Sequence, residues 1–133
     1  MPTGTSPSAR KPTVAGQRVL VVEDDAAMRE LLEETLQQEG FEVFTAADAA
    51  SALHKLEAES VHAVVTDLNL GGVNGIELCQ RVHALDATLP VVLITAFGSL
   101  DAAVGAVRAG AYDFITKPFK MEQLVLALRR AAN

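Results

Sequence analysis

The sequence predicts a single α/β domain in which a five-stranded parallel sheet is covered by helices on both faces. Short continuous apolar runs, such as residues 19–22 and 91–94, are typical of strands that are buried on both sides. Each strand-like segment is followed by a segment with apolar residues at helical spacing. The 133 residues, 50 % hydrophobic and 21 % charged, suit one globular domain. Strict alternation of strand and helix favours a parallel sheet.

The first two strand–helix units run from Val19 to about Leu56. After the strand at residues 19–22 comes a helix whose expected inner face carries Met28, Leu31, Leu32 and Leu36. Gly40 is expected to end this helix in a left-handed conformation. Residues 41–45 are more polar and predict an edge strand, and Asp48 is a suitable N-cap for the second helix.

The third and fourth units follow the same pattern. The third strand, residues 63–65, ends in Thr66 and Asp67, and Asn74 is expected to cap the next helix together with Glu77. The fourth strand, residues 91–94, ends at Thr95.

The last unit completes the predicted topology. The fourth helix is expected from about residue 100 to residue 109, ended by Gly110, and the fifth strand covers residues 114–115. The fifth helix is lined by Met121, Leu124, Val125 and Leu128. Right-handed crossovers leave few topologies for five such units, and we expect the flavodoxin-like strand order 2-1-3-4-5.

Charge is distributed unevenly along the chain. Residues 1–16 are rich in Pro, Gly, Ser and Thr and predict a disordered leader, whereas residues 17–133 form the domain. Without Arg10 and Lys11, the domain contains nine basic and seventeen acidic residues, so its net charge is −8. The net charge of the whole chain is −6. This balance argues against direct nucleic-acid binding, which needs a basic surface.

Membrane insertion and secretion are not expected. No apolar run approaches the ~20 residues of a membrane span, and the first residues have no hydrophobic signal segment. Cys79 is the only cysteine, which favours a reducing compartment, and we expect a cytoplasmic protein with Cys79 in its core. No ligand role is expected for the histidines, which are His54, His62 and His83.

The predicted strands end in residues that carry chemistry. Ligands of doubly wound sheets bind outside the carboxyl ends of the strands. That edge is expected to gather residues far apart in the sequence, namely Glu23, Asp24, Asp25, Asp67, Thr95 and Lys117. Carboxylates gathered there repel one another unless a cation intervenes, and oxygen ligands completed by water suit Mg²⁺. With a lysine and a hydroxyl beside it, Asp67 is placed to accept a phosphoryl group.

Four segments give the chain a resemblance to a known family. They are VLVVEDD, VVTDLNLGGVNGIEL, VVLITAFG and DFITKPF, in this order and at suitable spacing. Over residues 17–132 the chain resembles the receiver domain of two-component response regulators, in the chemotaxis-regulator-like superfamily. Residues 95–119 are most similar to receivers of enhancer-binding transcription activators.

The resemblance implies a role for each residue of the site. Asp67 is the expected phosphoacceptor. The implied Mg²⁺ ligands are Asp67, Asp24 directly, Glu23 through water and Asn69 through its backbone carbonyl. The residues implied to contact the phosphoryl group or to switch with it are Thr95, Ala96, Lys117 and Phe114. The bond between Lys117 and Pro118 is implied to be cis.

We make a further prediction for each of three positions around the site. Gly71 stands where the family usually has proline, which predicts a more flexible loop. Phe97 lies two residues after Thr95, and its bulk predicts a long-lived phosphoryl group. Asp25 is expected only to stabilise the N-terminus of the first helix.

The implied function is a regulatory phosphoacceptor that catalyses only its own phosphorylation and dephosphorylation. A histidine kinase donates the phosphoryl group, and the face made by the fourth helix, the fifth strand and the fifth helix then changes. That face is expected to bind a second copy of the chain, an output domain or an output protein. One alternative is a Mg²⁺-dependent phosphohydrolase with an aspartate nucleophile, although Asn69 replaces its second aspartate. Another is an interaction module without phosphorylation.

Overall fold

The computed structural model describes residues 16–70, 74–95 and 100–132, without the side chains of residues 100–103. Three positions singled out in the sequence, Gly71, Ala96 and Phe97, lie outside the described residues, as does the predicted leader up to residue 15.

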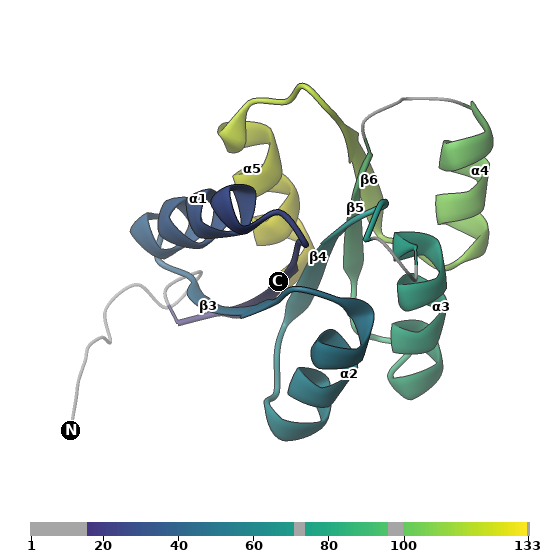
Figure 1. Ribbon diagram of the computed structural model, residues 1–133, viewed down its shortest axis with the longest axis horizontal. Helices are drawn as coiled ribbons and strands as arrows, with labels where there is room; N and C mark the ends of the chain where they lie inside the picture. The colour runs from purple at the N-terminus through teal and green to yellow at the C-terminus, as the bar shows by residue number, and fades with distance from the viewer. Residues whose placement is uncertain (1–15, 71–73, 96–99, 133) are drawn as a thin grey trace.

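Five parallel strands form one sheet at the centre of the molecule (Figure 1). Along the chain they are β2 (Arg18–Val22), β3 (Glu42–Ala46), β4 (Ala63–Asp67), β5 (Val91–Thr95) and β6 (Asp113–Thr116). Across the sheet their order is β3-β2-β4-β5-β6, with every neighbouring pair parallel. The second strand of the chain therefore lies at one edge, and the predicted order 2-1-3-4-5 is confirmed.

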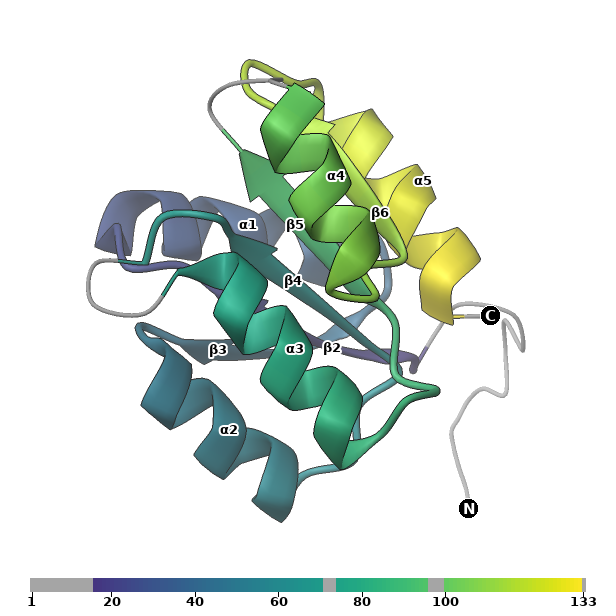
Figure 2. The ribbon, with the colours of Figure 1, turned by 90° about the vertical axis from the view of Figure 1, so that its right-hand side faces the viewer.

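Helices cover both faces of this sheet. They are α1 (Ala26–Gln38), α2 (Ala49–Ala58), α3 (Gly75–Leu85), α4 (Leu100–Arg108) and α5 (Met121–Ala132). Helices α1 and α5 lie on one face, and α2, α3 and α4 lie in front of the other (Figures 1 and 2). None of the helices in the described part of the chain has the length and apolar character needed to span a membrane.

The two faces of the sheet produce two hydrophobic cores, because successive side chains of a strand point to opposite sides. In β2, Val19 and Val21 pack with α1 and α5, whereas Leu20 and Val22 pack with α2 and α3. Both central strands β4 and β5 are buried along their whole length. The continuous apolar runs of the sequence therefore correspond to strands with no solvent-facing side.

Side-chain caps set the beginnings of three helices. The Asp25 carboxylate accepts from the backbone N–H of Ala27 at 3.0 Å, and Asp48 accepts from Ser51 at 2.7 Å. Asn74 accepts from the backbone N–H of Glu77 at 2.8 Å. These contacts confirm the predicted N-caps and leave fewer helix-terminal amides without a partner. The Glu77 side chain, expected to complete a capping box with Asn74, accepts from Arg81 at 2.7 Å.

Glycines with positive φ follow the first and fourth helices, as predicted. Gly40 has φ 99° and Gly110 has φ 89°, a backbone conformation that costs a glycine little and other residues more.

One predicted core residue of the first helix is wrong. Leu31 is 46 % exposed, whereas Leu32 and Leu36 are almost fully buried and Met28 is partly buried. Residues 28, 32 and 36 follow one another at four-residue spacing on the side facing the sheet, and Leu31 lies about 100° round the helix from Leu32. The interior stripe of α1 is therefore narrower than its apolar content predicts.

Small residues of α4 and of the turn after it contact α3. The Cys79 thiol donates to the Ala109 carbonyl at 3.5 Å. A Cβ atom at Gly105 would lie 2.8 Å from the Ile76 side chain, which fills the space that the glycine leaves. Cys79 is fully buried, as the sequence predicts.

We expect Leu78→Ala in α3 to lower the free energy of unfolding by about 2–5 kcal/mol, because the side chain is fully buried and its removal leaves a cavity. Leu85 of the same helix is 59 % exposed, so Leu85→Ala is the matched control. This substitution should change the free energy of unfolding by less than about 0.5 kcal/mol. Urea unfolding followed by circular dichroism measures both. Equal effects of the two substitutions would contradict the core assignment.

Candidate functional site

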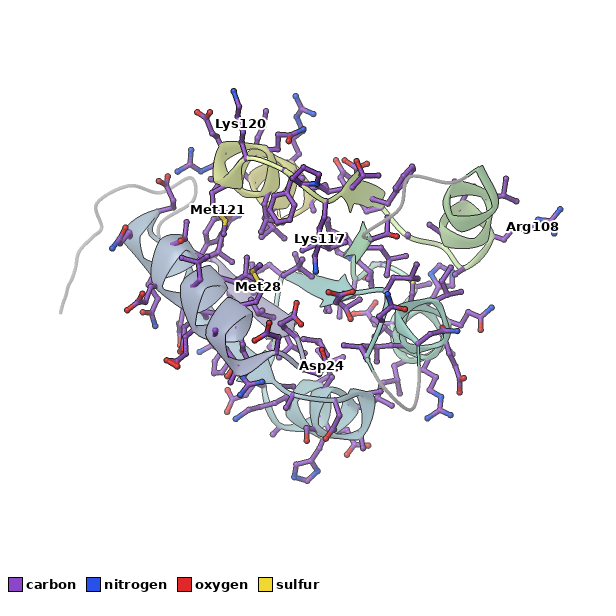
Figure 3. The ribbon with its side chains drawn as sticks, turned by 45° about the horizontal axis from the view of Figure 1, so that its top comes forward. Asp24, Met28, Arg108, Lys117, Lys120 and Met121 are labelled. Atoms are coloured by element: carbon purple, nitrogen blue, oxygen red, sulfur yellow. The ribbon has the colours of Figure 1, made fainter. Side chains whose placement is uncertain are left out.

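Polar side chains are buried where three neighbouring strands end. Glu23 follows β2, Asp67 ends β4 and Thr95 ends β5, and each is no more than 5 % exposed. Lys117 follows β6 on the far side of β5. Figure 3 shows Lys117 and Asp24 at this end of the sheet, coming from opposite sides. The predicted gathering of these residues at the carboxyl edge is therefore present.

Both carboxylate oxygens of Asp67 have a donor. Lys117 Nζ donates to Oδ2 at 2.8 Å, and the backbone N–H of Asn69 donates to Oδ1 at 2.9 Å. The hydrogen bond to Asp67 raises the pKa of Lys117, so the lysine is cationic at neutral pH. Asp67 is buried and Lys117 is one-third exposed, which places the cation between the carboxylate and solvent.

The backbone behind Asp67 is held by the start of α3. The Gly75 N–H donates to the Leu68 carbonyl at 2.7 Å, and the Leu68 N–H donates to the Ile94 carbonyl at 2.7 Å. A Cβ atom at residue 75 would collide with the Asp67 carbonyl oxygen and lie 2.9 Å from the Leu68 Cα. Only a glycine lets α3 begin this close to the aspartate.

Glu23 is crowded by other acids. Burial raises the pKa of Glu23 to about 7; the backbone N–H of Asp25 opposes this increase, and the charge of Asp67 and the Asp24 side chain add to it. Glu23 Oε2 accepts from that Asp25 N–H at 3.1 Å. A carboxylate in such surroundings ionises more readily when a cation is bound beside it.

The donor set suits a hard cation with few protein ligands. Within residues 16–70, 74–95 and 100–132, no three acidic, histidine or cysteine side chains are gathered closely enough to hold a metal ion by themselves. Mg²⁺ typically takes one or two carboxylates and keeps several waters. Two direct carboxylates, the exposed one of Asp24 and the buried one of Asp67, with the buried Glu23 reached through water, would match that coordination.

The end of β5 is tied to the segment that carries the lysine. The Lys117 backbone N–H donates to the Thr95 carbonyl at 2.7 Å, and Thr95 stands opposite Thr116 in the sheet. The Lys117–Pro118 peptide bond is cis, as implied by the resemblance. Asp25 caps α1, as expected, and all three histidines are exposed.

Phe114 lies away from the strand ends. It stands opposite Leu93 in the middle of the sheet edge, and its half-buried ring lines a surface groove between β6 and α5. Tyr112 is half exposed in the turn before β6.

Two residues that the sequence did not single out contact the site. Gly75 packs against the Asp67 backbone, and Arg29 of α1 donates from Nη1 to the Glu23 carbonyl at 2.8 Å. Arg29 lies one helical turn after the Asp25 cap. This spacing was the only feature of the sequence that could have indicated its contact with the site.

Fold and site together define a CheY-like regulatory domain, with a doubly wound sheet and acidic side chains gathered at its carboxyl edge. The response regulator receiver domain family matches residues 19–129, and the chain belongs to that family.

Relatives and solved structures agree with this assignment. The dicarboxylate transport transcriptional regulatory protein DctD of Rhizobium meliloti is 39 % identical over 117 residues, which are 88 % of this chain and 25 % of DctD. The transcriptional regulatory protein TcrA of Mycobacterium tuberculosis is 36 % identical over 129 residues, 97 % of this chain and 51 % of TcrA. The chain thus spans only a quarter to a half of the length of these relatives.

The structural neighbours share the whole fold. A CheY-like receiver domain protein from Methanospirillum hungatei has a TM-score of 0.83 and 30 % identity, with 89 % of this chain and 94 % of that chain covered. The receiver domain of NtrX from Brucella abortus has a TM-score of 0.80 and 40 % identity, with 86 % and 97 % covered.

We expect Gly75→Ala to destabilise the protein by about 1–3 kcal/mol or more, because the added methyl group must displace the Asp67 and Leu68 backbone. The matched control is Gly105→Ala, whose methyl group meets only the end of the Ile76 side chain. Thermal unfolding of both variants measures the difference. A Gly75→Ala protein as stable as Gly105→Ala would show that the close approach of α3 is not required.

Proposed function

We propose that Asp67 accepts a phosphoryl group from a phosphorylated histidine of a partner kinase, in a reaction that requires Mg²⁺. The observation that carries this proposal is the pairing of buried Asp67 with Lys117 at 2.8 Å, beside the acids Glu23 and Asp24. A cation and a nucleophilic carboxylate at the carboxyl edge of a doubly wound sheet suit phosphoryl transfer.

The proposed step is a displacement at phosphorus. A carboxylate oxygen of Asp67 forms a bond to phosphorus while the phosphorus–nitrogen bond to the kinase histidine breaks. The electron pair of that bond stays on the imidazole, which is protonated from solvent, and the product is an acyl phosphate on Asp67. Lys117 exchanges its contact with Asp67 for one with the phosphoryl oxygens and offsets their charge.

Mg²⁺ fits next to this aspartate. Asp24, Asp67 and the backbone carbonyl of Asn69 would hold it directly and Glu23 through water, and when bound it would supply positive charge that screens the carboxylates from the incoming phosphoryl group. The Asn69 N–H remains on Asp67 Oδ1 and keeps the carboxylate in one orientation.

Phosphorylation is proposed to change the face made by α4, β6 and α5. Thr95 would bind the new phosphoryl group and Phe114 would follow it, as the resemblance implies. The face already carries exposed apolar side chains, namely Val104, Val107, Tyr112 and Leu126. A groove of about 560 Å³ lies between β6 and α5, with Phe114 in its wall and Arg130 and Asp113 at its sides.

This face is proposed to bind a second copy of the chain or an output domain in the cytoplasm. Its apolar residues supply contact area, and the mixed charges at its edge favour polar pairing over nucleic-acid binding. Arg108 of α4 and Lys120 before α5 both point outward (Figure 3).

We expect Asp67→Asn to abolish the response to beryllofluoride, which with Mg²⁺ mimics an aspartyl phosphate. In the parent protein, the amide NMR signals of α4, β6 and α5 should shift on its addition, and in Asp67→Asn they should not move. Asp25→Asn is the matched control, because it neutralises a nearby acid and asparagine still caps α1. Shifts in Asp67→Asn equal to those in the parent would contradict the phosphoacceptor assignment.

We expect Val107→Glu to weaken self-association by about tenfold or more in the presence of Mg²⁺ and beryllofluoride, since a charge would be buried without a partner. Val107 is 71 % exposed on α4. Leu85→Glu is the control, because Leu85 is similarly exposed on α3, outside the proposed face. Sedimentation velocity measures both variants, and equal weakening by both would place the contact elsewhere.

A further inference from the structure

Arg29 connects the first helix to the loop that carries the acids. Its side chain runs back from α1, and Nη1 donates to the backbone carbonyl of Glu23 at 2.8 Å. The residue is half-buried. A hydrogen bond from a charged guanidinium is stronger than one between neutral groups.

This bond is one of several that hold the backbone of the acidic loop. The Glu23 N–H donates to the Ala46 carbonyl at 3.0 Å, which ties the loop to the edge strand β3, and the Arg29 N–H donates to the Asp25 carbonyl at 2.9 Å. The Asp25 N–H donates to the Glu23 carboxylate at 3.1 Å. The side-chain bond from Arg29 fixes the Glu23 carbonyl.

The geometry of the peptide explains why this carbonyl matters. The Glu23 C=O and the Asp24 N–H belong to one planar peptide unit, so the direction of the carbonyl sets the direction of the N–H and the place of the Asp24 Cα. Asp24 is exposed, and its side chain interacts with the Glu23 carboxylate.

We propose that Arg29 is a positioning residue for Mg²⁺ binding, which holds the peptide between Glu23 and Asp24 so that both carboxylates face Asp67. The inference rests on the proposed function, since it assumes that these acids bind Mg²⁺. Residues that hold metal ligands in position through hydrogen bonds strongly affect the affinity of a site for its metal.

Two simpler roles for Arg29 predict different results. If the residue acted only as a nearby positive charge, it would repel Mg²⁺, and its neutralisation would strengthen Mg²⁺ binding. If it acted only on stability, its loss would lower the melting temperature by the same amount with and without Mg²⁺. A positioning role predicts weaker Mg²⁺ binding despite the removal of a positive charge.

The test uses three variants of the full chain. Arg29→Gln removes the charge and the guanidinium, Arg29→Lys keeps the charge on a shorter donor, and Arg81→Gln is the control. Arg81 pairs with Glu77 on the exposed side of α3, so its loss changes the net charge equally without contact to the acidic loop. Isothermal titration calorimetry gives the Kd for MgCl₂, and thermal unfolding in EDTA and in MgCl₂ gives the stabilisation by the ion.

We expect the Kd of Arg29→Gln for Mg²⁺ to rise about tenfold or more, with a smaller gain in melting temperature on adding MgCl₂. Arg29→Lys should lie between this variant and the parent, and Arg81→Gln should bind as the parent does or slightly more tightly. An unchanged or lower Kd in Arg29→Gln would overturn the inference. If that variant does not fold, a Kd for Arg29→Lys at or below the parental value overturns it.

Failure of the proposed function looks different. A parent protein that binds no Mg²⁺ in either measurement would overturn the metal-dependent function, and the role of Arg29 with it. A parent that binds Mg²⁺ together with an Arg29→Gln variant that binds it equally well overturns only the role of Arg29.

Discussion

Negative charge buried at the carboxyl ends of the strands is the constraint on which the rest of this structure depends. Glu23 and Asp67 are nearly inaccessible to solvent, and the other polar residues buried in the described part of the chain, Thr66 and Thr95, are uncharged. Ionised groups in such surroundings are costly unless they are paired and hydrogen-bonded. Lys117 pairs with Asp67, backbone amides donate to both carboxylates, and Arg29 donates to the Glu23 carbonyl. Burial still raises the pKa of Glu23 to about 7, and a cation bound beside it would lower that pKa.

The fold was largely predictable because simple patterns of apolar residues in the sequence indicate where the strands are. Runs that are apolar at every position, such as residues 91–94, can only lie in the middle of a sheet that is covered on both faces. Asp48 and Asn74 were recognisable as caps because their side chains bond to amides two or three residues away, within the same stretch of sequence. Leu31 was misplaced because hydrophobicity alone does not say how wide the buried side of a helix is.

The site was predictable to the extent that side chains define it. Glu23, Asp67 and Lys117 each follow a strand, and parallel strands end at one edge, so topology alone brings them together. Gly75 and Arg29 escaped recognition because each acts on a backbone carbonyl, of Asp67 and of Glu23. Every residue has such a carbonyl, and no pattern of residue types marks the one that will be contacted. These contacts require the path of the loop in three dimensions.

The contact between α4 and α3 couples the sizes of two residues. The Ile76 side chain occupies the space that Gly105 leaves, and a Cβ atom at residue 105 would lie 2.8 Å from it. Close packing of this kind passes a change of volume on one helix directly to its neighbour. A larger residue at position 105 therefore requires the end of the Ile76 side chain to move or to be replaced by a smaller one.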